Sequence, residues 1–263
     1  MGKLANRLVK GMKSVGRLPE IAQCLKKCGS PVSVILGYLQ LAKPPRQVVY
    51  KTKYRLDLQD WADLTTAWVV FLGSEYRIFP SDRTIVDFGA NIGAFAILAA
   101  DENTQATIVC VEPFPANFDR LNATIAQNQL GDRVRTRACA LAGSDRIVSF
   151  DSSTDIPSHS RKIADEGPPV DNVTRIQAYS LESFMRMEGL ETIDFLKMDI
   201  EGAEYEALLG AGPDTLKKVK RIGLEYHRDG HESLTEHLQK SGFAITYHPK
   251  KGRSGVIEYT RQA

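Results

Sequence analysis

Residues 84–93 read TIVDFGANIG, and this stretch decides the fold. Its β-branched run ends at Asp87, and a turn with glycines at positions 89 and 93 follows. The next residues, AFAILAA, are small and apolar, so the order predicts a buried strand, a tight turn and a helix. The turn opens on the helix N-terminus, where unpaired N–H groups favour polar or anionic ligand groups. Because Gly89 and Gly93 lack Cβ atoms, the backbone can approach a ligand there, and we expect both to contact a nucleotide-like cofactor.

A second apolar run, TIVCVE at residues 107–112, ends in Glu112 roughly twenty residues after the glycine turn. A carboxylate at the end of the second strand of such a fold accepts two hydrogen bonds from a ribose diol. We therefore predict that Glu112 binds the ribose of the cofactor. The alternative is a strand-end acid that only faces water, and it is weaker because Asp87 holds the same position on the preceding strand.

The acid before the turn indicates which cofactor is bound. An enzyme that uses a nicotinamide dinucleotide normally shows Gly-x-Gly-x-x-Gly, but residues 89–93 read GANIG. The carboxylate of Asp87 repels a pyrophosphate and favours a cationic ammonium or sulfonium. We therefore predict S-adenosyl-L-methionine, with Asp87 at its cationic end and the Asn91 side chain at its amino-acid end. Alternatively, Asn91 serves only as a turn residue that tolerates the left-handed conformation.

The third informative segment is residues 193–204, IDFLKMDIEGAE. Together with VDFGANIG at 86–93 and VEPFP at 111–115, it resembles the FkbM family of S-adenosylmethionine-dependent methyltransferases, over roughly residues 48–227. The Lys-x-Asp-x-Glu-Gly-x-Glu pattern makes the combination specific. The resemblance implies the Rossmann-like class I methyltransferase fold and O-methylation of a hydroxyl on a sugar, glycolipid or secondary metabolite. The motifs do not themselves name that acceptor.

Three residues near the carboxyl ends of later strands are candidates for the chemistry. Methyl transfer from a sulfonium is an in-line displacement, so the acceptor has to be held on that line, and an oxygen acceptor benefits from a base. Asp199 ends its strand where open α/β sheets bind ligands, and we predict that Asp199 and Glu201 orient the acceptor or the sulfonium. Glu201 has the alternative role of stabilising a helix start. His227 ends the next strand and is either a general base or an ordinary histidine of the surface or core.

A lysine, Lys197, precedes Asp199 on the same face of its strand and needs a counter-charge if it is buried. We predict that Glu225 on the following strand is this partner. The oxygen-rich set of Asp199, Glu201, Glu225 and His227 would suit magnesium. The ammonium in its midst argues against a metal, and we predict none.

The chain divides into an N-terminal helical extension at residues 1–45 and a methyltransferase domain at residues 46–263. In the domain, apolar runs alternate with helical patterns, which predicts a doubly wound, mostly parallel seven-stranded α/β sheet covered on both faces. The expected strands are 84–88, 107–111, 133–140, 193–198, 220–227, 243–248 and 254–260, and the expected helices are 92–101, 115–129, 202–211 and 231–240. Before this core we expect strands or a hairpin at 48–58, a helix capped by Asp60 and a short strand at 76–79. A polar stretch at 151–170 is predicted to be a long loop.

The composition is that of an ordinary globular enzyme. The 263 residues are 43% hydrophobic and 25% charged, and the net charge of +2 gives no indication of nucleic acid. No apolar run reaches the length of a membrane span, and the first residues lack the apolar core and cleavage site typical of a signal peptide. The four cysteines resemble buried thiols rather than a disulfide framework; Cys24 and Cys28 could alternatively pair or bind a metal, but no cluster of His or Cys lies near them in the sequence. We therefore predict a cytoplasmic protein with a small-molecule or glycan acceptor and no nucleic-acid partner.

Residues 3–17 add a feature that the family resemblance does not cover. Basic residues recur there at steps of three and four, opposite a stripe of apolar ones, as in a basic amphipathic helix. Such a helix can lie on an anionic membrane surface, which predicts peripheral contact with the inner face of the membrane. The alternative is a helix that packs on the rest of the protein, and Gly11 and Gly16, which weaken an isolated helix, favour it.

Three rival functions remain open at this stage. A methyltransferase acting on nitrogen of a small amine or peptide would need no strong base, so His227 would matter less to it. A module that binds a nucleoside ligand without turnover is disfavoured, because the acids Asp87, Glu112, Asp199 and Glu201 are all intact. A nicotinamide oxidoreductase is the weakest of the three because of the glycine pattern.

Overall fold

The computed structural model describes residues 17–151, 164–165, 173–200, 202–227, 231–248 and 254–262. Residues 3–16, Glu201 and the side chain of His227, all of which carry predictions, lie outside this part of the chain. Two compact units are formed, one by the chain up to Glu75 together with Ala126–Asn128, and the other by Tyr76–Ile125 and Gln129 onward. The boundary after residue 45, between the N-terminal helical extension and the methyltransferase domain, stays a prediction.

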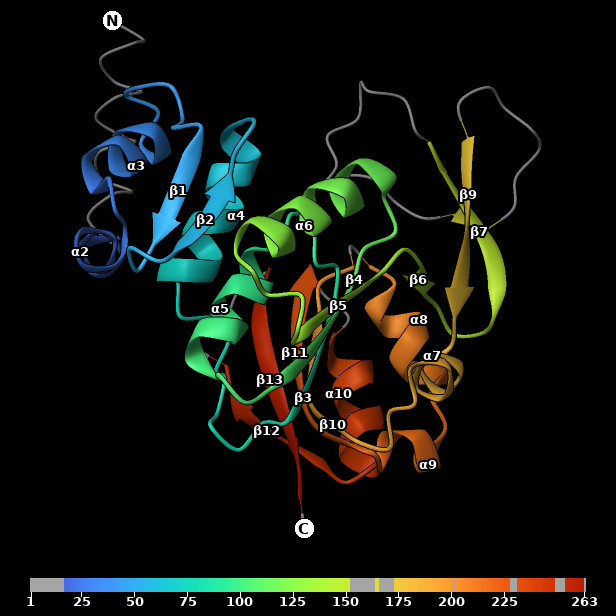
Figure 1. Ribbon diagram of the computed structural model, residues 1–263. Coiled ribbons are helices and arrows are strands. Elements are labelled where there is room, and N and C mark those ends of the chain that lie inside the picture. The colour runs from blue at the N-terminus through green and yellow to red at the C-terminus, as the bar shows by residue number, and fades with distance from the viewer. Residues whose placement is uncertain are drawn as a thin grey trace, which may run out of the picture. The chain divides into compact units, whose positions relative to one another are not determined.

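The first unit consists of helices around a β-hairpin (Figure 1). Asp60 caps its longest helix, as predicted, because its side chain accepts hydrogen bonds from Ala62 N at 2.9 Å and Asp63 N at 3.0 Å. Stacked aromatic rings fill the interior, Tyr38 on Trp68 with centroids 3.9 Å apart. The elements are α2 (Leu18–Lys27), α3 (Pro31–Tyr38), β1 (Gln47–Tyr50), β2 (Tyr54–Asp57) and α4 (Trp61–Leu72).

The second unit is built on a seven-stranded sheet with the order β12-β13-β11-β10-β3-β4-β5. Strands β11, β10, β3, β4 and β5 pair in parallel, and β13 runs antiparallel to both of its neighbours. The fold class predicted from the sequence is confirmed. The bounds are β3 (Thr84–Phe88), β4 (Thr107–Val111), β5 (Val134–Arg137), β10 (Ile193–Met198), β11 (Val219–His227), β12 (Phe243–Tyr247) and β13 (Ser254–Arg261).

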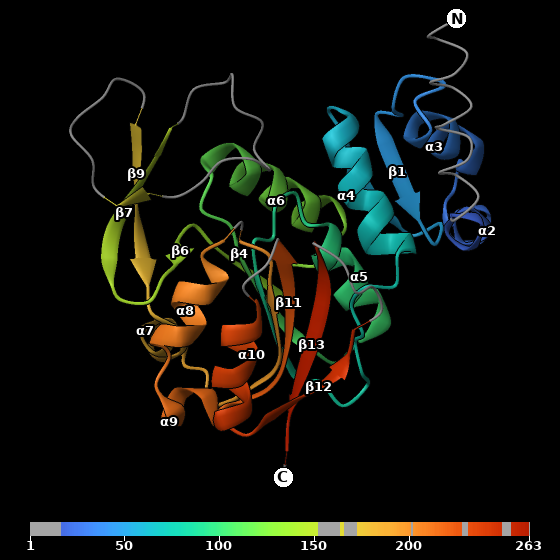
Figure 2. The ribbon, with the colours of Figure 1, turned by 180° about the vertical axis from the view of Figure 1, so that it is seen from behind.

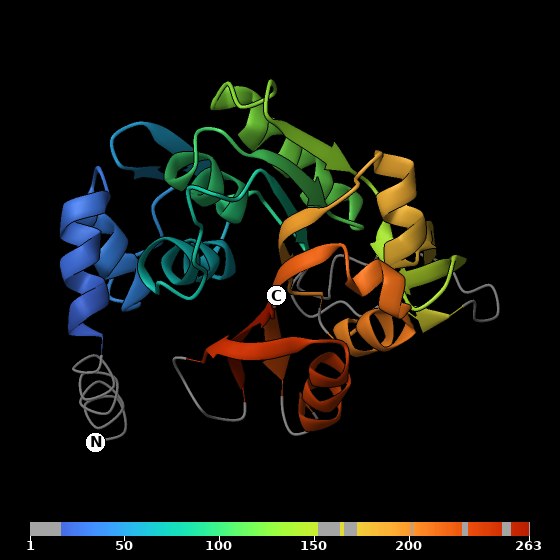
Figure 3. The same cartoon turned by 90° about the horizontal axis from the view of Figure 1, so that it is seen from below.

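Helices cover both faces of this sheet (Figures 2 and 3). Alternate strand residues such as Phe88, Met198 and Leu224 pack with apolar residues of α7, α8 and α10. The intervening residues face α5, where Phe195 contacts Phe95 with ring centroids 6.2 Å apart. Helices α7 and α9 were not predicted. The bounds are α5 (Ala94–Glu102), α6 (Pro115–Gln127), α7 (Leu181–Glu188), α8 (Glu204–Gly210), α9 (Pro213–Leu216) and α10 (His231–Lys240).

A second, four-stranded sheet lies between β5 and α7 in the sequence and was not predicted. It has the order β6-β9-β7-β8, with β6 (Ala140–Leu141), β7 (Arg146–Asp151), β8 (Ala164–Asp165) and β9 (Val173–Tyr179). The predicted strand at 133–140 is therefore too long: β5 ends at Arg137, and Ala140 pairs with Ala178 of the second sheet. Part of the predicted loop at 151–170 is strand β8.

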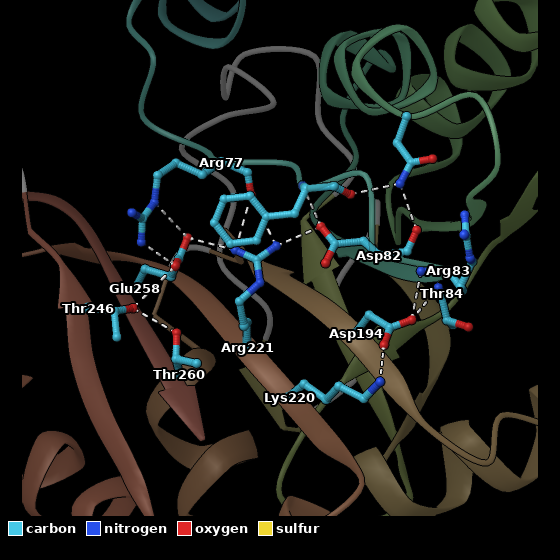
Figure 4. Close-up of polar contacts among 12 residues, drawn as sticks. Arg77, Asp82, Arg83, Thr84, Asp194, Lys220, Arg221, Thr246, Glu258 and Thr260 are labelled. Atoms are coloured by element: carbon cyan, nitrogen blue, oxygen red, sulfur yellow. Dashed lines mark hydrogen bonds and ion pairs between the residues drawn. The ribbon is translucent and has the colours of Figure 1, made fainter. Parts of the chain in front are cut away.

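The amino ends of the strands are joined by a buried ionic network (Figure 4). Arg221 on β11 bonds Asp82 at 2.7 Å, Glu258 at 3.1 Å and the Arg77 carbonyl at 3.2 Å. The predicted strand at 76–79 is wrong, because the Arg77 carbonyl accepts from this side chain and Phe79 N bonds the Asp82 carboxylate, so neither joins a ladder. Within the described residues, no helix is long and apolar enough to span a membrane.

Candidate active site

The glycine turn after β3 is held by backbone bonds to the next strand and by close packing. Gly89 N and Ala90 N both donate to the Val111 carbonyl at 3.0 Å. Gly89 has a φ of +81°, and a Cβ there would lie 1.8 Å from the Asp199 carbonyl oxygen. A side chain at position 89 would therefore force the ends of β3 and β10 apart, so this glycine is required by packing. Its closeness to a cofactor stays a prediction.

The turn also contains residues with left-handed backbone beyond Gly89. Asn91 has a φ of +49° and Gly93 a φ of +91°, and α5 begins directly after Gly93. Asn91 thus has the turn conformation that was considered for it. Its side-chain oxygen Oδ1 is buried and accepts no hydrogen bond from the described residues, so an acceptor is left unpaired at the helix N-terminus.

Beneath the turn lies a buried ion pair. The Lys197 ammonium is 2.7 Å from Asp87 Oδ1, donates to the Gly89 carbonyl at 3.0 Å and lies 3.9 Å from Asp199 Oδ2. We predicted that Glu225 is the direct partner of Lys197, and this prediction is wrong, because the ammonium contacts Asp87 instead. The register explains the difference, because β10 places Lys197 opposite Asp87 on β3 and opposite Gly223 on β11.

The buried charges of Asp87 and Lys197 stabilise each other. Burial raises the pKa of Asp87, and the neighbouring Lys197 offsets part of this rise. Burial lowers the pKa of Lys197, but the carboxylates of Asp87, Asp199 and, less strongly, Glu225 outweigh it and bring the pKa above its ordinary value. The Asp87 oxygen that does not face Lys197, Oδ2, is buried without a hydrogen bond from the described residues. Such an acceptor fits the ammonium or sulfonium of S-adenosylmethionine.

Glu112, at the end of β4, ties the turn to the loop that follows. Its carboxylate accepts from Asn91 N at 2.8 Å and from Phe114 N at 3.0 Å. Burial raises the pKa of Glu112 to about 7, although these backbone donors lower it. Each carboxylate oxygen has a second lone pair, so the residue can hold the turn and still accept from a ribose diol. The sequence did not indicate the two backbone donors.

Asp199 lies at the same edge of the sheet, just beyond β10. Its backbone N–H donates to the Phe88 carbonyl at 3.1 Å, and its side chain is 30% exposed. The loop that follows is held by Glu204, whose carboxylate accepts from Ile200 N and Gly202 N, both at 2.7 Å. Glu204 is the first residue of α8, as expected of a first-turn helix acid rather than a catalyst.

The structure thus brings together Asp87, Asn91, Glu112 and Asp199 at the carboxyl ends of β3, β4 and β10. Two of the predicted catalytic residues are not placed by it. The backbone of His227 ends β11, the strand next to β10, but its side chain lies outside the described part of the chain, as does all of Glu201. Their roles remain predictions. Within the described residues, no group of three His, Cys, Asp or Glu side chains is arranged to hold a metal ion.

The second sheet is attached to this edge at two points that sequence reasoning missed. Phe150 on β7 contacts Phe114, which follows Glu112, with ring centroids 4.6 Å apart. Arg146 on the same strand forms two bonds with Glu206 of α8, at 2.7 and 2.9 Å. The signal for β7 was present, because the run IVSF at 147–150 is rich in β-formers.

Comparison with known proteins gives the family. Residues 87–245 match the family described as the methyltransferase FkbM domain. Methyltransferase sdnD of Sordaria araneosa is 27% identical over 80% of this chain and 87% of its own length. The 31-O-demethyl-FK506 methyltransferase FkbM of Streptomyces tacrolimicus is 24% identical over 59% and 68% of the two chains. The 2-O-methyltransferase NoeI of Sinorhizobium fredii is 28% identical over 55% and 63%.

The family match begins at Asp87 and extends past β11, so it contains the glycine turn, Glu112 and Asp199. It also contains the three segments on which the resemblance was based, apart from the first residue of the earliest one. The chain is a methyltransferase and belongs to the FkbM family.

Proposed function

We propose that this enzyme transfers the methyl group of S-adenosyl-L-methionine to a hydroxyl of a small-molecule or glycan acceptor. The observation that carries the cofactor assignment is that two buried acceptors at the turn, Asp87 Oδ2 and Asn91 Oδ1, receive no hydrogen bond from the part of the chain that the structure describes. A buried acceptor without a donor costs free energy, and a ligand that brings N–H groups or positive charge removes this cost. Support for oxygen as the acceptor atom comes from two relatives whose names describe O-methylation.

The net charge of the site favours a cationic cofactor over a dinucleotide. Asp87 and Lys197 neutralise each other, and Asp199 adds one negative charge 3.9 Å from the ammonium. With its pKa at about 7, Glu112 adds part of a second negative charge at neutral pH. The bound cofactor would supply an electrophilic methyl on a sulfonium, whose positive charge this field stabilises. A pyrophosphate would be repelled by the same charges.

Each residue has a distinct role in this proposal. Asp87 and Asn91 bind the amino-acid end of the cofactor, Gly89 and Gly93 let the backbone approach it, and Glu112 binds the ribose. These contacts fix the direction of the methyl before an acceptor arrives.

The acceptor side is proposed to depend on the acids beyond β10 and on the end of β11. Asp199, partly exposed and close to Lys197, orients the acceptor hydroxyl. Glu201 assists Asp199, and His227 takes the proton that the hydroxyl loses as the oxygen–methyl bond forms. No metal is included. We also propose that residues 3–17 contact a membrane surface.

The test is transfer of isotope-labelled methyl from S-adenosylmethionine to a panel of hydroxylated glycans and polyketides and to their amine analogues. We expect label on oxygen, lost in Asp199→Asn, with Lys240→Glu on α10 as a matched surface control. Loss of the alkaline rise in rate in His227→Ala would identify the base. Label only on the amines would establish the N-methyltransferase instead, and cofactor binding without transfer to any compound would favour the binding module.

A further inference from the structure

The charge of this chain is distributed very unevenly along the sequence. Residues 1–56 contain twelve lysines and arginines and one acidic residue, Glu20, which gives a net charge of +11. The remaining 207 residues contain 22 basic and 31 acidic residues, a net charge of −9. The overall value of +2 conceals this asymmetry. A strongly basic segment attached to an acidic domain is typical of a surface that binds a polyanion or an anionic membrane.

Exposed apolar side chains gather in the same part of the chain, five of them within residues 1–56 and a sixth, Trp61, shortly after. Among the described residues, eleven large apolar side chains are exposed, and six of them belong to the first unit. Helix α2 presents Leu18 and Leu25, two turns apart on one face, and α3 presents Val32 and Leu36, one turn apart. The remaining two are Leu41 and Trp61.

Four of these residues belong to α3 or contact its C-terminal half, and we call them the α3 patch: Val32, Leu36, Leu41 and Trp61. Leu41 N donates to the Leu36 carbonyl at 2.8 Å, which folds the chain back over the helix end. The Trp61 indole N–H donates to the Gly37 carbonyl at 3.0 Å while 43% of the residue stays exposed. The exposed basic residues Lys43 and Arg46 follow within a few positions of Leu41.

The hydrogen bonding of the Trp61 indole indicates that the ring contacts an apolar partner. Its single donor is already satisfied inside the protein, so the ring can leave water without an unpaired N–H group. Tryptophan with an apolar ring and a satisfied polar end is typical of the membrane–water interface. Nucleic acid is a poorer fit, because it is bound through stacked aromatic platforms, and three members of the α3 patch are aliphatic.

We infer that the first unit docks on an anionic lipid surface through the α3 patch and the basic residues around it. The aliphatic residues and Trp61 enter the headgroup boundary, and Lys43 and Arg46 contact lipid phosphates. This surface consists of described residues and does not depend on residues 3–16. It is also independent of methyl transfer, so failure of one proposal leaves the other standing.

The full chain contains two tryptophans, and they allow a direct test. Trp61 is exposed, whereas Trp68 is 1% exposed and stacked on Tyr38. With vesicles of phosphatidylglycerol and phosphatidylcholine, we expect the fluorescence to shift to shorter wavelength and to be quenched by lipids with brominated chains. The Trp61→Phe variant reports Trp68 alone and should show neither change. Phosphatidylcholine vesicles without the anionic lipid should bind weakly.

Two double variants test the apolar and the electrostatic contributions to vesicle binding separately. Leu36→Ser with Leu41→Ser, and separately Lys43→Glu with Arg46→Glu, should each weaken vesicle partitioning about tenfold or more. Matched controls in the other unit are Leu209→Ser with Ile245→Ser and Lys218→Glu with Lys240→Glu, and these should partition as the unaltered chain does. Circular dichroism establishes that each variant is folded.

Three results would overturn the inference. The first is vesicle binding without a change in Trp61 emission, because another surface would then be in contact. The second is binding of single-stranded nucleic acid with no binding of vesicles. The third is a dimer in sedimentation whose Trp61 is already protected from quenching and which ignores vesicles, because the α3 patch would then be an interface between copies.

Discussion

The two ends of the seven-stranded sheet each contain a buried cation, but among the described residues the groups around the cation are fully paired at only one end. At the amino ends, Arg221 is surrounded by Asp82, Glu258 and a backbone carbonyl (Figure 4). Its guanidinium lies 4.1 Å from the centroid of the Phe79 ring. At the carboxyl ends, Lys197 pairs with Asp87 Oδ1, and among the described residues Asp87 Oδ2 and the Asn91 oxygen have no hydrogen-bond donor. The difference shows that a network whose buried polar groups are all paired stabilises the fold, whereas a network that leaves a buried acceptor unpaired can bind a ligand there. We call the first end saturated and the second unsaturated.

The largest expected effect is on the saturated end. Arg221→Met removes the cation between two buried carboxylates, and we expect a loss of about 3–5 kcal/mol in the free energy of unfolding. Urea titration measures it. At temperatures where the variant is folded, its affinity for S-adenosylhomocysteine should be unchanged. A stable variant with lost affinity would remove the distinction between the two ends.

The next effect is a pH dependence at the unsaturated end. Burial raises the pKa of Glu112 from 4.5 to about 7, so the folded chain binds this proton more tightly than the unfolded chain does. The resulting stabilisation is fully present below pH 4.5 and is lost as the pH rises through about 7, a change of roughly 3 kcal/mol.

Urea titrations at pH 4.5 and pH 8 test it by comparison with Glu112→Gln, which carries no such proton. The difference in free energy of unfolding between the unaltered chain and this variant should change with pH in the stated direction. If the two chains lose stability in parallel, Glu112 does not titrate near pH 7.

Measurements of turnover and of cofactor affinity should distinguish Asp199 from the residues that bind the cofactor. Asp199→Asn keeps the size of the side chain but removes the charge beside Lys197, and we expect turnover to fall about a hundredfold with little change in cofactor affinity. Steady-state rates and calorimetry measure the two effects. Equal losses in both would make Asp199 a cofactor-binding residue.

The smallest effect concerns the second sheet. Glu206→Gln weakens the bond to Arg146, and because both side chains are partly exposed, the cost in stability should be below about 1 kcal/mol. If this sheet helps to shape the acceptor site, KM for the acceptor should rise while the affinity for the cofactor stays the same. Unchanged KM would make the sheet a structural addition.

The strands that carry the site could be predicted because buried parallel strands are continuous apolar runs, such as IVCV before Glu112. The partner of Lys197 could not be predicted, because it depends on the register between β10 and β3. The backbone donors to Glu112 could not be predicted either, since they arise from how the turn and the Phe114 loop fold together. The second sheet was missed because two of its strands, β6 and β8, have two residues each and a long polar stretch lies between β7 and β9.

The central claim is that the unpaired carboxylate oxygen of Asp87 exists to bind a cationic cofactor. Calorimetry with S-adenosylhomocysteine, which keeps the ammonium, tests it most directly on the unaltered chain and on Asp87→Asn. We expect binding by the unaltered chain, a loss of about 1–3 kcal/mol in the variant, and no binding of NAD by either chain. Equal affinity of the two chains for S-adenosylhomocysteine, or binding of NAD in its place, would contradict the claim.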